Sequence, residues 1–173
     1  SFLYYFGLNF SGVSAFIDAD SGVEMIFADE PTMADIIFLG PQEPLSDTAA
    51  KAGVTESAPQ AKLAEILDKA VKQGRKIHYL PQYRGENMIR LEKLLSIPIA
   101  EIPNNVSVDL IKAVAAQREI KSDEEIAEME RSMDICYEMH TAAMKAARPG
   151  KYEYELSGLI EGIAQSMNGR LSF

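Results

Sequence analysis

The feature that most constrains this sequence is a long helical pattern that begins at Ser122 and stops before Arg148-Pro149-Gly150. The segment Ser122-Asp-Glu-Glu125 has the form of a capping box, in which the serine hydroxyl accepts a backbone N–H and the glutamate reaches back. Its acidic first turn also suits the positive end of the helix dipole. The pattern predicts a single helix of about 26 residues, about 40 Å long. A stripe with a spacing of three or four residues follows this start, made of Ile126, Met129, Met133, Cys136, His140 and Ala143.

A second apolar helix follows the Arg-Pro-Gly stop and is predicted to end at Asn168-Gly169, residue types that favour a helix C-terminus. Its apolar face contains Leu156, Leu159, Ile160, Ile163 and Met167. Helices with apolar stripes bury them against another surface. We therefore expect the two helices either to fold back on the preceding part of the chain or to pair between chains. We predict a dimer formed at least partly by residues 122–170.

The part of the chain before Pro103 alternates between strand-like and helical segments. Two β-favouring runs, residues 13–17 and 23–27, flank a polar connection that contains Gly22 and predict a β-hairpin. Residues 76–80 predict a further strand, which Pro81 stops. The alternation favours an α/β layer structure with a short, partly parallel sheet. Helices are predicted at residues 31–40, 46–52, 61–73, 86–95 and 108–119, with a brief extended stretch around Val54.

Composition disfavours several classes of function. The formal net charge of −9 over 173 residues argues against binding to nucleic acid or to an anionic membrane surface. No run of eighteen apolar residues occurs in the sequence, so no membrane-spanning helix is predicted. The single cysteine, Cys136, excludes a disulfide framework and a multi-cysteine zinc site, and fits a cytoplasmic location. The densest basic group, Lys72, Arg75 and Lys76, is expected to be a solvated helix end.

The first ten residues, SFLYYFGLNF, lack the basic region and the cleavage site of a signal peptide. They resemble the middle of a folded element, and we expect further residues upstream. The 173 residues are enough for one packed domain, or for one domain and a piece of another.

No local pattern in the sequence forms a catalytic constellation. Neither His78 nor His140 lies in an H-E-x-x-H zinc motif. His78 lies in a predicted strand and is interpreted as a hydrogen-bonded sheet histidine. Cys136 and His140 lie one helical turn apart, which favours interhelical packing over a nucleophilic pair. Asp18, Asp20 and Glu24 resemble the start of a calcium-binding loop, but the glycine and the last glutamate of such a loop are not at the required positions. A hairpin turn is therefore favoured. The methionines of the long helix are interpreted as core residues; they are Met129, Met133, Met139 and Met144.

Two stretches resemble the aminopeptidase P and prolidase-like family, whose catalytic domain has the pita-bread fold. The segment from Phe2 to Gly7 resembles the aromatic run that precedes a glycine and a hairpin in that family. The stronger resemblance runs from Leu110 to Glu161, where a helix leads into R-x-I-K-S-x-E-E-I, a long helix, R-P-G and a helix opening with E-x-E-L. The matching positions are Arg118, Ile120, Lys121, Ser122, Glu124, Glu125, Ile126, Arg148, Pro149, Gly150, Glu153, Glu155 and Leu156.

The resemblance implies an α/β fold of the ribonuclease H-like, creatinase N-terminal type, followed by the first two helices of a truncated pita-bread domain. Residues 1–106 are then the N-terminal domain, expected to lack its first elements. Residues 107–121 are a linker helix, and residues 122–173 begin the catalytic domain.

The family implies a peptidase that removes an N-terminal residue preceding proline, so that its substrate is a peptide with proline in second position. Two divalent metals, commonly manganese, are held there by two Asp, one His and two Glu ligands and activate a bridging hydroxide. No position of this sequence aligns with these ligands, so the resemblance implies that this segment binds no metal and is inactive alone. A homo-oligomer is also implied.

One position of the N-terminal part is implied to line a substrate site. In the family, a Trp two residues before a Gly reaches toward an active site, often that of a neighbouring subunit. Ile37-Phe38-Leu39-Gly40 aligns with this segment and places Phe38 at the Trp. The phenylalanine keeps an aromatic ring but loses the indole N–H. The alternative is that Phe38 fills a small core.

Two further functions stay open. Members of the pita-bread family that lost their metals act in protein binding, and the metal ligands expected downstream would separate this alternative from the leading hypothesis of a peptidase. Nuclease activity is suggested only by analogy with the ribonuclease H-like fold, which is a weak warrant. The negative net charge opposes it.

Overall fold

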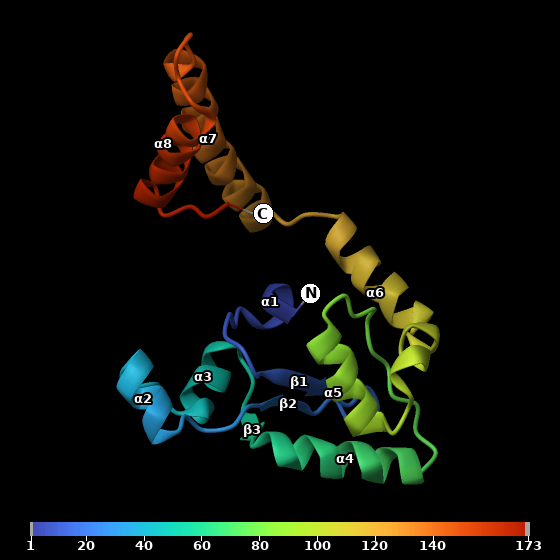
Figure 1. Cartoon of the computed structure of the whole chain (residues 1–173). Helices are drawn as coiled ribbons and strands as arrows, with labels where there is room; N and C mark the ends of the chain where they lie inside the picture. The colour runs from blue at the N-terminus through green and yellow to red at the C-terminus, as the bar shows by residue number, and fades with distance from the viewer. Residues whose placement is uncertain (1, 172–173) are drawn as a thin grey trace. The chain divides into compact units, whose positions relative to one another are not determined.

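The computed structural model describes residues 2–171. Contacts divide the chain into two compact units that meet between Ala115 and Ala116. This boundary lies within the predicted linker helix, while the assignment of residues 122–173 to a catalytic domain stays a prediction. In chain order, the elements of the first unit are α1 (Phe2–Phe6), β1 (Ser14–Ile17), β2 (Glu24–Phe27), α2 (Met33–Leu39), α3 (Leu45–Lys51), β3 (Glu56–Ala58), α4 (Gln60–Lys72), α5 (Gly85–Leu95) and the 3₁₀ turns at Ile99–Glu101 and Pro103–Asn105. The helix α6 (Val108–Glu119) crosses the boundary, and the second unit contains α7 (Asp123–Ala146) and α8 (Glu153–Ser166) (Figure 1).

Within the described residues the sheet has the strand order β1-β2-β3. The strands β1 and β2 form the predicted antiparallel hairpin, in which Ser14 pairs with Phe27. The strand β3 runs parallel to β2, which confirms the prediction of a partly parallel sheet. The extended stretch expected around Val54 lies slightly later, at Glu56–Ala58, because the Val54 N–H donates to the Ala49 carbonyl at the end of α3.

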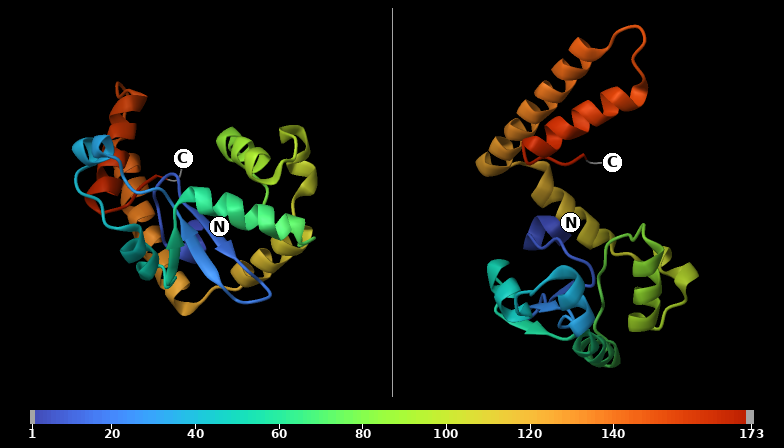
Figure 2. Two further views of the ribbon diagram at one scale, coloured as in Figure 1. Left: turned by 90° about the horizontal axis from the view of Figure 1, so that it is seen from below. Right: turned by 60° about the vertical axis from the view of Figure 1, so that its left-hand side comes forward.

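The core of the first unit lies on both faces of this sheet. Successive side chains of a strand point to opposite faces, and the neighbours Ile26 and Phe27 on β2 are both 0% exposed. Ile26 packs with Leu45 and Ala49 of α3, whereas Phe27 packs with residues of α4. Figure 2 shows α4 lying along the sheet. The helix predicted at residues 61–73 is confirmed as α4, and its Leu63, Leu67 and Ala70 are buried.

Gln60, the first residue of α4, joins several segments of the first unit. Its side-chain amide donates to the backbone carbonyls of Gly12 and Phe27, at 2.6 and 2.7 Å. Its side-chain oxygen accepts a hydrogen bond from the half-buried Arg90 of α5. Its backbone N–H donates to the Asp29 carboxylate at 3.0 Å, which satisfies an amide at the start of α4.

The turn of the hairpin is tied to the end of α4 by an ion pair. The Arg75 guanidinium donates to both carboxylate oxygens of Asp18, at 3.0 and 2.5 Å, and to Asp20 at 2.7 Å. The backbone N–H of Asp20 also donates to Asp18, as in a turn. The hairpin interpretation of these carboxylates is confirmed. The prediction that Arg75 is a solvated charge is wrong, because its part-buried guanidinium pairs with Asp18, which lies 57 residues away in the sequence.

This ion pair predicts a change of stability with pH. The hydrogen bond from Arg75 and that from the Asp20 backbone hold the pKa of Asp18 well below its ordinary value. A carboxyl whose pKa is lowered by folding stabilises the native state above its unfolded pKa of about 3.9, and this contribution is lost as the pH falls toward the folded pKa. We expect Asp18→Asn to lower the urea midpoint near pH 7, with a smaller difference from the natural chain near pH 3. A difference that stays constant with pH would contradict this role.

The predicted strand at residues 76–80 is absent from the sheet that residues 2–171 form. Its backbone contacts a helix start instead of a neighbouring strand, since the Tyr79 carbonyl accepts a hydrogen bond from the Ser107 N–H at 3.1 Å. The buried Tyr79 hydroxyl donates to the Ile102 carbonyl at 3.0 Å. The segment has the composition of a strand, but a strand forms only where another strand lies beside it.

The second unit consists mainly of α7 and α8, which pack against each other. The capping box predicted for α7 is confirmed, because the Ser122 hydroxyl accepts from the Glu125 N–H and the Glu125 carboxylate accepts from the Ser122 N–H. None of the helices among residues 2–171 is both long enough and apolar enough to cross a membrane.

Candidate functional site

The most exposed apolar surface of the first unit is the short helix α2. Its start is fixed by a capping box, in which Thr32 and Asp35 exchange hydrogen bonds with each other's backbone and side chain. The hydrogen bonds from Thr32 hold the pKa of Asp35 below its ordinary value. Gly40, at φ 81°, ends the helix. The exposed side chains of this surface, here called the α2 surface, are Met33, Ile37, Phe38 and Leu39.

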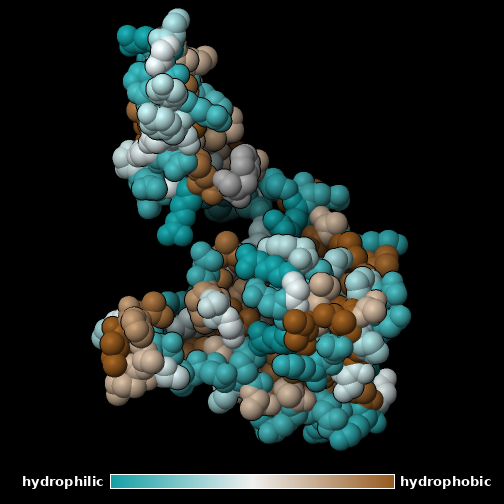
Figure 3. Space-filling view, viewed as in Figure 1, coloured by the Kyte–Doolittle hydropathy of each residue, from teal (hydrophilic) through white to brown (hydrophobic). Residues whose placement is uncertain are grey.

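Figure 3 shows brown and tan side chains gathered over α2, at the left edge of the first unit. None of the helix's residues is buried. A seven-residue helix has little stability of its own, so the capping box and the flanking loops hold its shape. The result is a contiguous apolar surface on a small, ordered projection, which is typical of an interaction site.

Phe38 is the most exposed residue of this surface, with 84% of its area accessible. The alternative interpretation, in which Phe38 fills a small core, is therefore wrong. The role of Phe38 at a substrate site stays a prediction. The exposure of Ile37 and Leu39 was not predicted, although the run Ile36-Ile-Phe-Leu39 carries the signal: four consecutive apolar residues cannot all face one side of a helix.

The two histidines do not form a site. His78 Nδ1 lies 2.6 Å from the hydroxyl of Ser107, which also accepts the Leu110 N–H and so caps α6. His78 is hydrogen-bonded as expected, but to a helix cap and not within a sheet. Cys136 is half-buried and His140 is exposed, so the packing interpretation does not hold for His140.

The methionines of α7 are also placed differently from the prediction. Met139 is half-buried. The prediction of a core position is wrong for the other three methionines, Met129, Met133 and Met144, which are exposed. The apolar and aromatic residues exposed along α7, here called the α7 stripe, are Ile126, Met129, Met133, Tyr137 and Met144.

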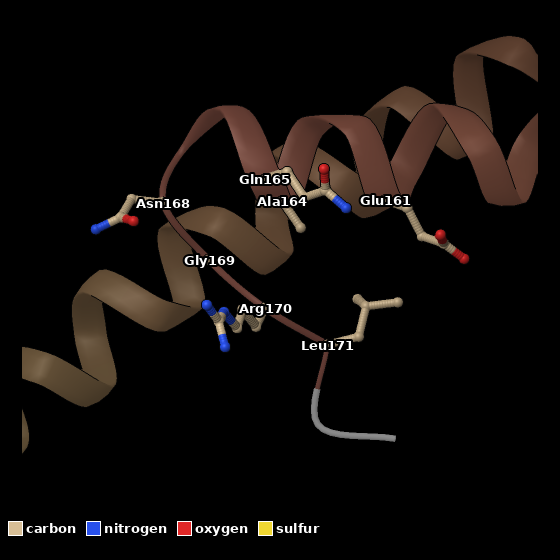
Figure 4. Close-up of a pocket in the computed structure, with 7 residues that line it drawn as sticks. All are labelled: Glu161, Ala164, Gln165, Asn168, Gly169, Arg170 and Leu171. Atoms are coloured by element: carbon tan, nitrogen blue, oxygen red, sulfur yellow. The ribbon is translucent and has the colours of Figure 1, made fainter. Parts of the chain in front are cut away.

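A depression of about 530 Å³ lies at the C-terminal end of α8 (Figure 4). The polar residues that line it are Glu161, Gln165, Asn168 and Arg170. Among residues 2–171 no three His, Cys, Asp or Glu side chains are grouped so that they could hold a metal ion. The described residues therefore do not fit the dinuclear centre that the family resemblance implies.

Solved structures of aminopeptidase P share this fold. Proline aminopeptidase P II from Yersinia pestis matches with a TM-score of 0.76 and 21% sequence identity over 98% of this chain. Two substituted forms of Escherichia coli aminopeptidase P give TM-scores of 0.72 and 0.70, each with 21% identity over 95% of this chain. The chain spans 41% of the length of the Yersinia structure and 39% of each Escherichia coli structure. Its mixed α/β fold is therefore the fold of aminopeptidase P-type structures.

A comparison with family models gives a match to part of the chain. Residues 1–79 match the model described as aminopeptidase P, N-terminal domain. This match and the shared fold confirm the resemblance to aminopeptidase P that the sequence predicted, and the predicted α/β fold class is confirmed. A search of curated proteins finds no match.

Proposed function

We propose that this chain is the non-catalytic front part of a dinuclear-metal aminopeptidase that removes an N-terminal residue preceding proline. In this proposal the segment helps to assemble oligomers and to shape access to the substrate site. The family match of residues 1–79 and the fold shared with aminopeptidase P structures support the class of enzyme. The α2 surface is the observation that supports the role of this segment.

The α2 surface suits contact with a peptide substrate or a neighbouring subunit. Phe38 presents a rigid aromatic ring with few rotatable bonds, so that its immobilisation on binding costs little entropy. Proline and the aliphatic side chains of a peptide are apolar and pack well against such a ring. The capping box of Thr32 and Asp35 orders the helix before any partner binds, which lowers the cost of binding.

The two divalent metals, for which manganese is the expected identity, belong to the complete enzyme in this proposal. They would supply an activated hydroxide and stabilise negative charge. Since the described residues do not fit such a centre, no step of the reaction is assigned to side chains of this chain.

Phe38 provides the test of this function. In the complete enzyme, Phe38→Ala is expected to lower kcat/KM for Xaa-Pro peptides about two- to twelvefold, the effect of losing one aromatic contact worth about 0.5–1.5 kcal/mol. Steady-state cleavage assays with manganese measure this change. Tyr83→Ala is the matched control, because Tyr83 is an equally exposed aromatic residue outside α2. If the complete enzyme did not cleave Xaa-Pro peptides, the proposal of a peptidase would be refuted. Equal kcat/KM values for the two variants would refute only the role of Phe38.

We further propose that the chain forms homo-oligomers and that residues 122–170 contribute to the contact. The exposed α7 stripe supports this, since apolar side chains along one line of a helix gain free energy by leaving water. Sedimentation is expected to show a dimer of this chain, and Met133→Glu combined with Met144→Glu is expected to shift it toward monomer. Lys145→Glu, an exposed charge on the same helix, serves as the control. A monomer at all concentrations would contradict the proposal.

The alternative is a non-catalytic, protein-binding member of the same family. The exposed apolar side chains of the α2 surface favour it as much as they favour the enzyme. The two proposals separate on the complete polypeptide: the enzyme has an ordered set of two Asp, one His and two Glu ligands, and the binding protein lacks part of it.

A further inference from the structure

The end of α8 is closed by the dipeptide Asn168-Gly169. Asn168 has a left-handed backbone with φ 59°. The N–H of Gly169 donates to the carbonyl of Ala164 at 2.7 Å, and the N–H of Asn168 donates to the carbonyl of Gln165 at 3.0 Å. These bonds satisfy carbonyls that the last turn of a helix leaves without partners.

The fold restricts both positions of this dipeptide. Among residues with a side chain, asparagine is one of the few that adopt the left-handed conformation readily. At the next position, a Cβ atom would lie 3.1 Å from the Ala164 carbonyl oxygen and 3.2 Å from the Ile135 side chain of α7. A side chain at position 169 would have to displace these neighbours by a few tenths of an ångström, so glycine suits an α8 that ends close against α7. Packing thus favours an Asn-Gly pair, which is the only one among the five asparagines of the sequence.

Asn-Gly is also a chemically labile pair. Glycine carries no side chain to hinder or restrain its backbone nitrogen, and asparagine is a thermolabile residue. The Asn168 side chain is exposed. It points away from Gln165 and Glu161 in Figure 4, and among the described residues no hydrogen bond holds its carboxamide. The bond from Gly169 to Ala164 restrains the nitrogen, but the terminal turn of a helix opens locally far more often than the whole fold unfolds.

We propose that Asn168 is a site of spontaneous deamidation in this protein, and that the modification weakens the contact of α8 with α7. The backbone nitrogen of Gly169 forms a bond with Cγ of Asn168, and the side-chain nitrogen leaves as ammonia. Water then opens the resulting five-membered imide at either carbonyl. One product has aspartate at position 168, and the other is isoaspartate, in which the backbone runs through the side-chain carbon.

Both products disturb the end of α8. Aspartate places a negative charge beside the negative end of the helix dipole, which is unfavourable. Isoaspartate adds a methylene to the backbone, so that Gly169 can no longer keep both its hydrogen bond to Ala164 and its close contact with Ile135. We expect the amides of the last turn of α8 to exchange hydrogen faster after modification.

The experiment follows the folded chain at neutral pH and elevated temperature by peptide mass spectrometry, with enzymatic methylation to detect isoaspartate. Asn168 is expected to convert on the order of ten times faster than Asn9, Asn87, Asn104 or Asn105. The same chain unfolded in urea gives the intrinsic rate. Asn168→Gly is the matched control, because it keeps a residue suited to the left-handed position and removes the reactive group.

Conversion at Asn168, with faster exchange in the last turn of α8 and no such change in Asn168→Gly, would support the proposal. An intact Asn168 in the folded chain, at times when the unfolded chain is fully converted, would overturn it. Conversion of Asn168 without any change in the hydrogen exchange of α8 would overturn the proposal that the modification weakens the contact with α7, because the modified helix end would then keep its contacts.

Discussion

Phe27→Ala is expected to lower the free energy of unfolding of the first unit by about 3–5 kcal/mol, the usual cost of removing a buried aromatic side chain. Phe27 is fully buried on β2 and packs with Leu63 and Leu67 of α4. Its removal leaves a cavity between the sheet and that helix. Domains of this kind are stable by only about 5–15 kcal/mol, so the variant should unfold at a much lower urea concentration. Circular dichroism measures the shift of the midpoint.

Phe38→Ala is the matched control for this experiment. It removes the same side chain from a position that is 84% exposed, where substitutions usually change stability by less than about 0.5 kcal/mol. The two variants therefore separate the role of one phenylalanine in the fold from the role of another on the surface. Similar losses of stability in both would mean that α2 packs against the unit more closely than the structure describes.

Gln60→Ala is expected to lower the free energy of unfolding by about 2–3 kcal/mol, in the range for a hydrogen bond to a charged group and for buried groups left without partners. The substitution removes the donor to the carbonyls of Gly12 and Phe27 and the acceptor for Arg90. Burial holds the pKa of the half-buried Arg90 below its ordinary value, so water replaces this hydrogen bond only in part. Urea unfolding at neutral pH measures the loss.

The control for Gln60 lies at the other end of the same helix. Gln73 follows α4 and is exposed, so Gln73→Ala is expected to change stability by less than about 0.5 kcal/mol. An equally small effect of Gln60→Ala would show that water replaces its hydrogen bonds, and that the side chain does not hold the sheet, α4 and α5 together.

Much of the fold follows from short stretches of sequence. The hairpin of β1 and β2, the capping box of Ser122 and Glu125 and the stop before Arg148 all lie where the residues predict them. Each of these features depends on hydrogen bonds between residues a few positions apart, so that a local pattern is enough to specify it.

The predictions that failed depend on contacts between distant residues. Residues 76–80 have the composition of a strand, but the start of α6 lies where a strand would have to pair with Tyr79. Arg75 looks like a solvated charge until the fold brings Asp18 beside it. Likewise, periodicity placed one stripe along α7 but did not separate the side that packs with α8 from the exposed α7 stripe.

The candidate site shows the same division. The sequence by itself determined the hairpin, the ends of several helices and the resemblance to aminopeptidase P, because each depends on residue types at fixed spacings. Only the tertiary structure decided that Phe38 stands on an exposed surface and Phe27 inside the core. Two phenylalanines have the same intrinsic preference for burial, and which of them is covered depends on the elements that the fold packs around each one.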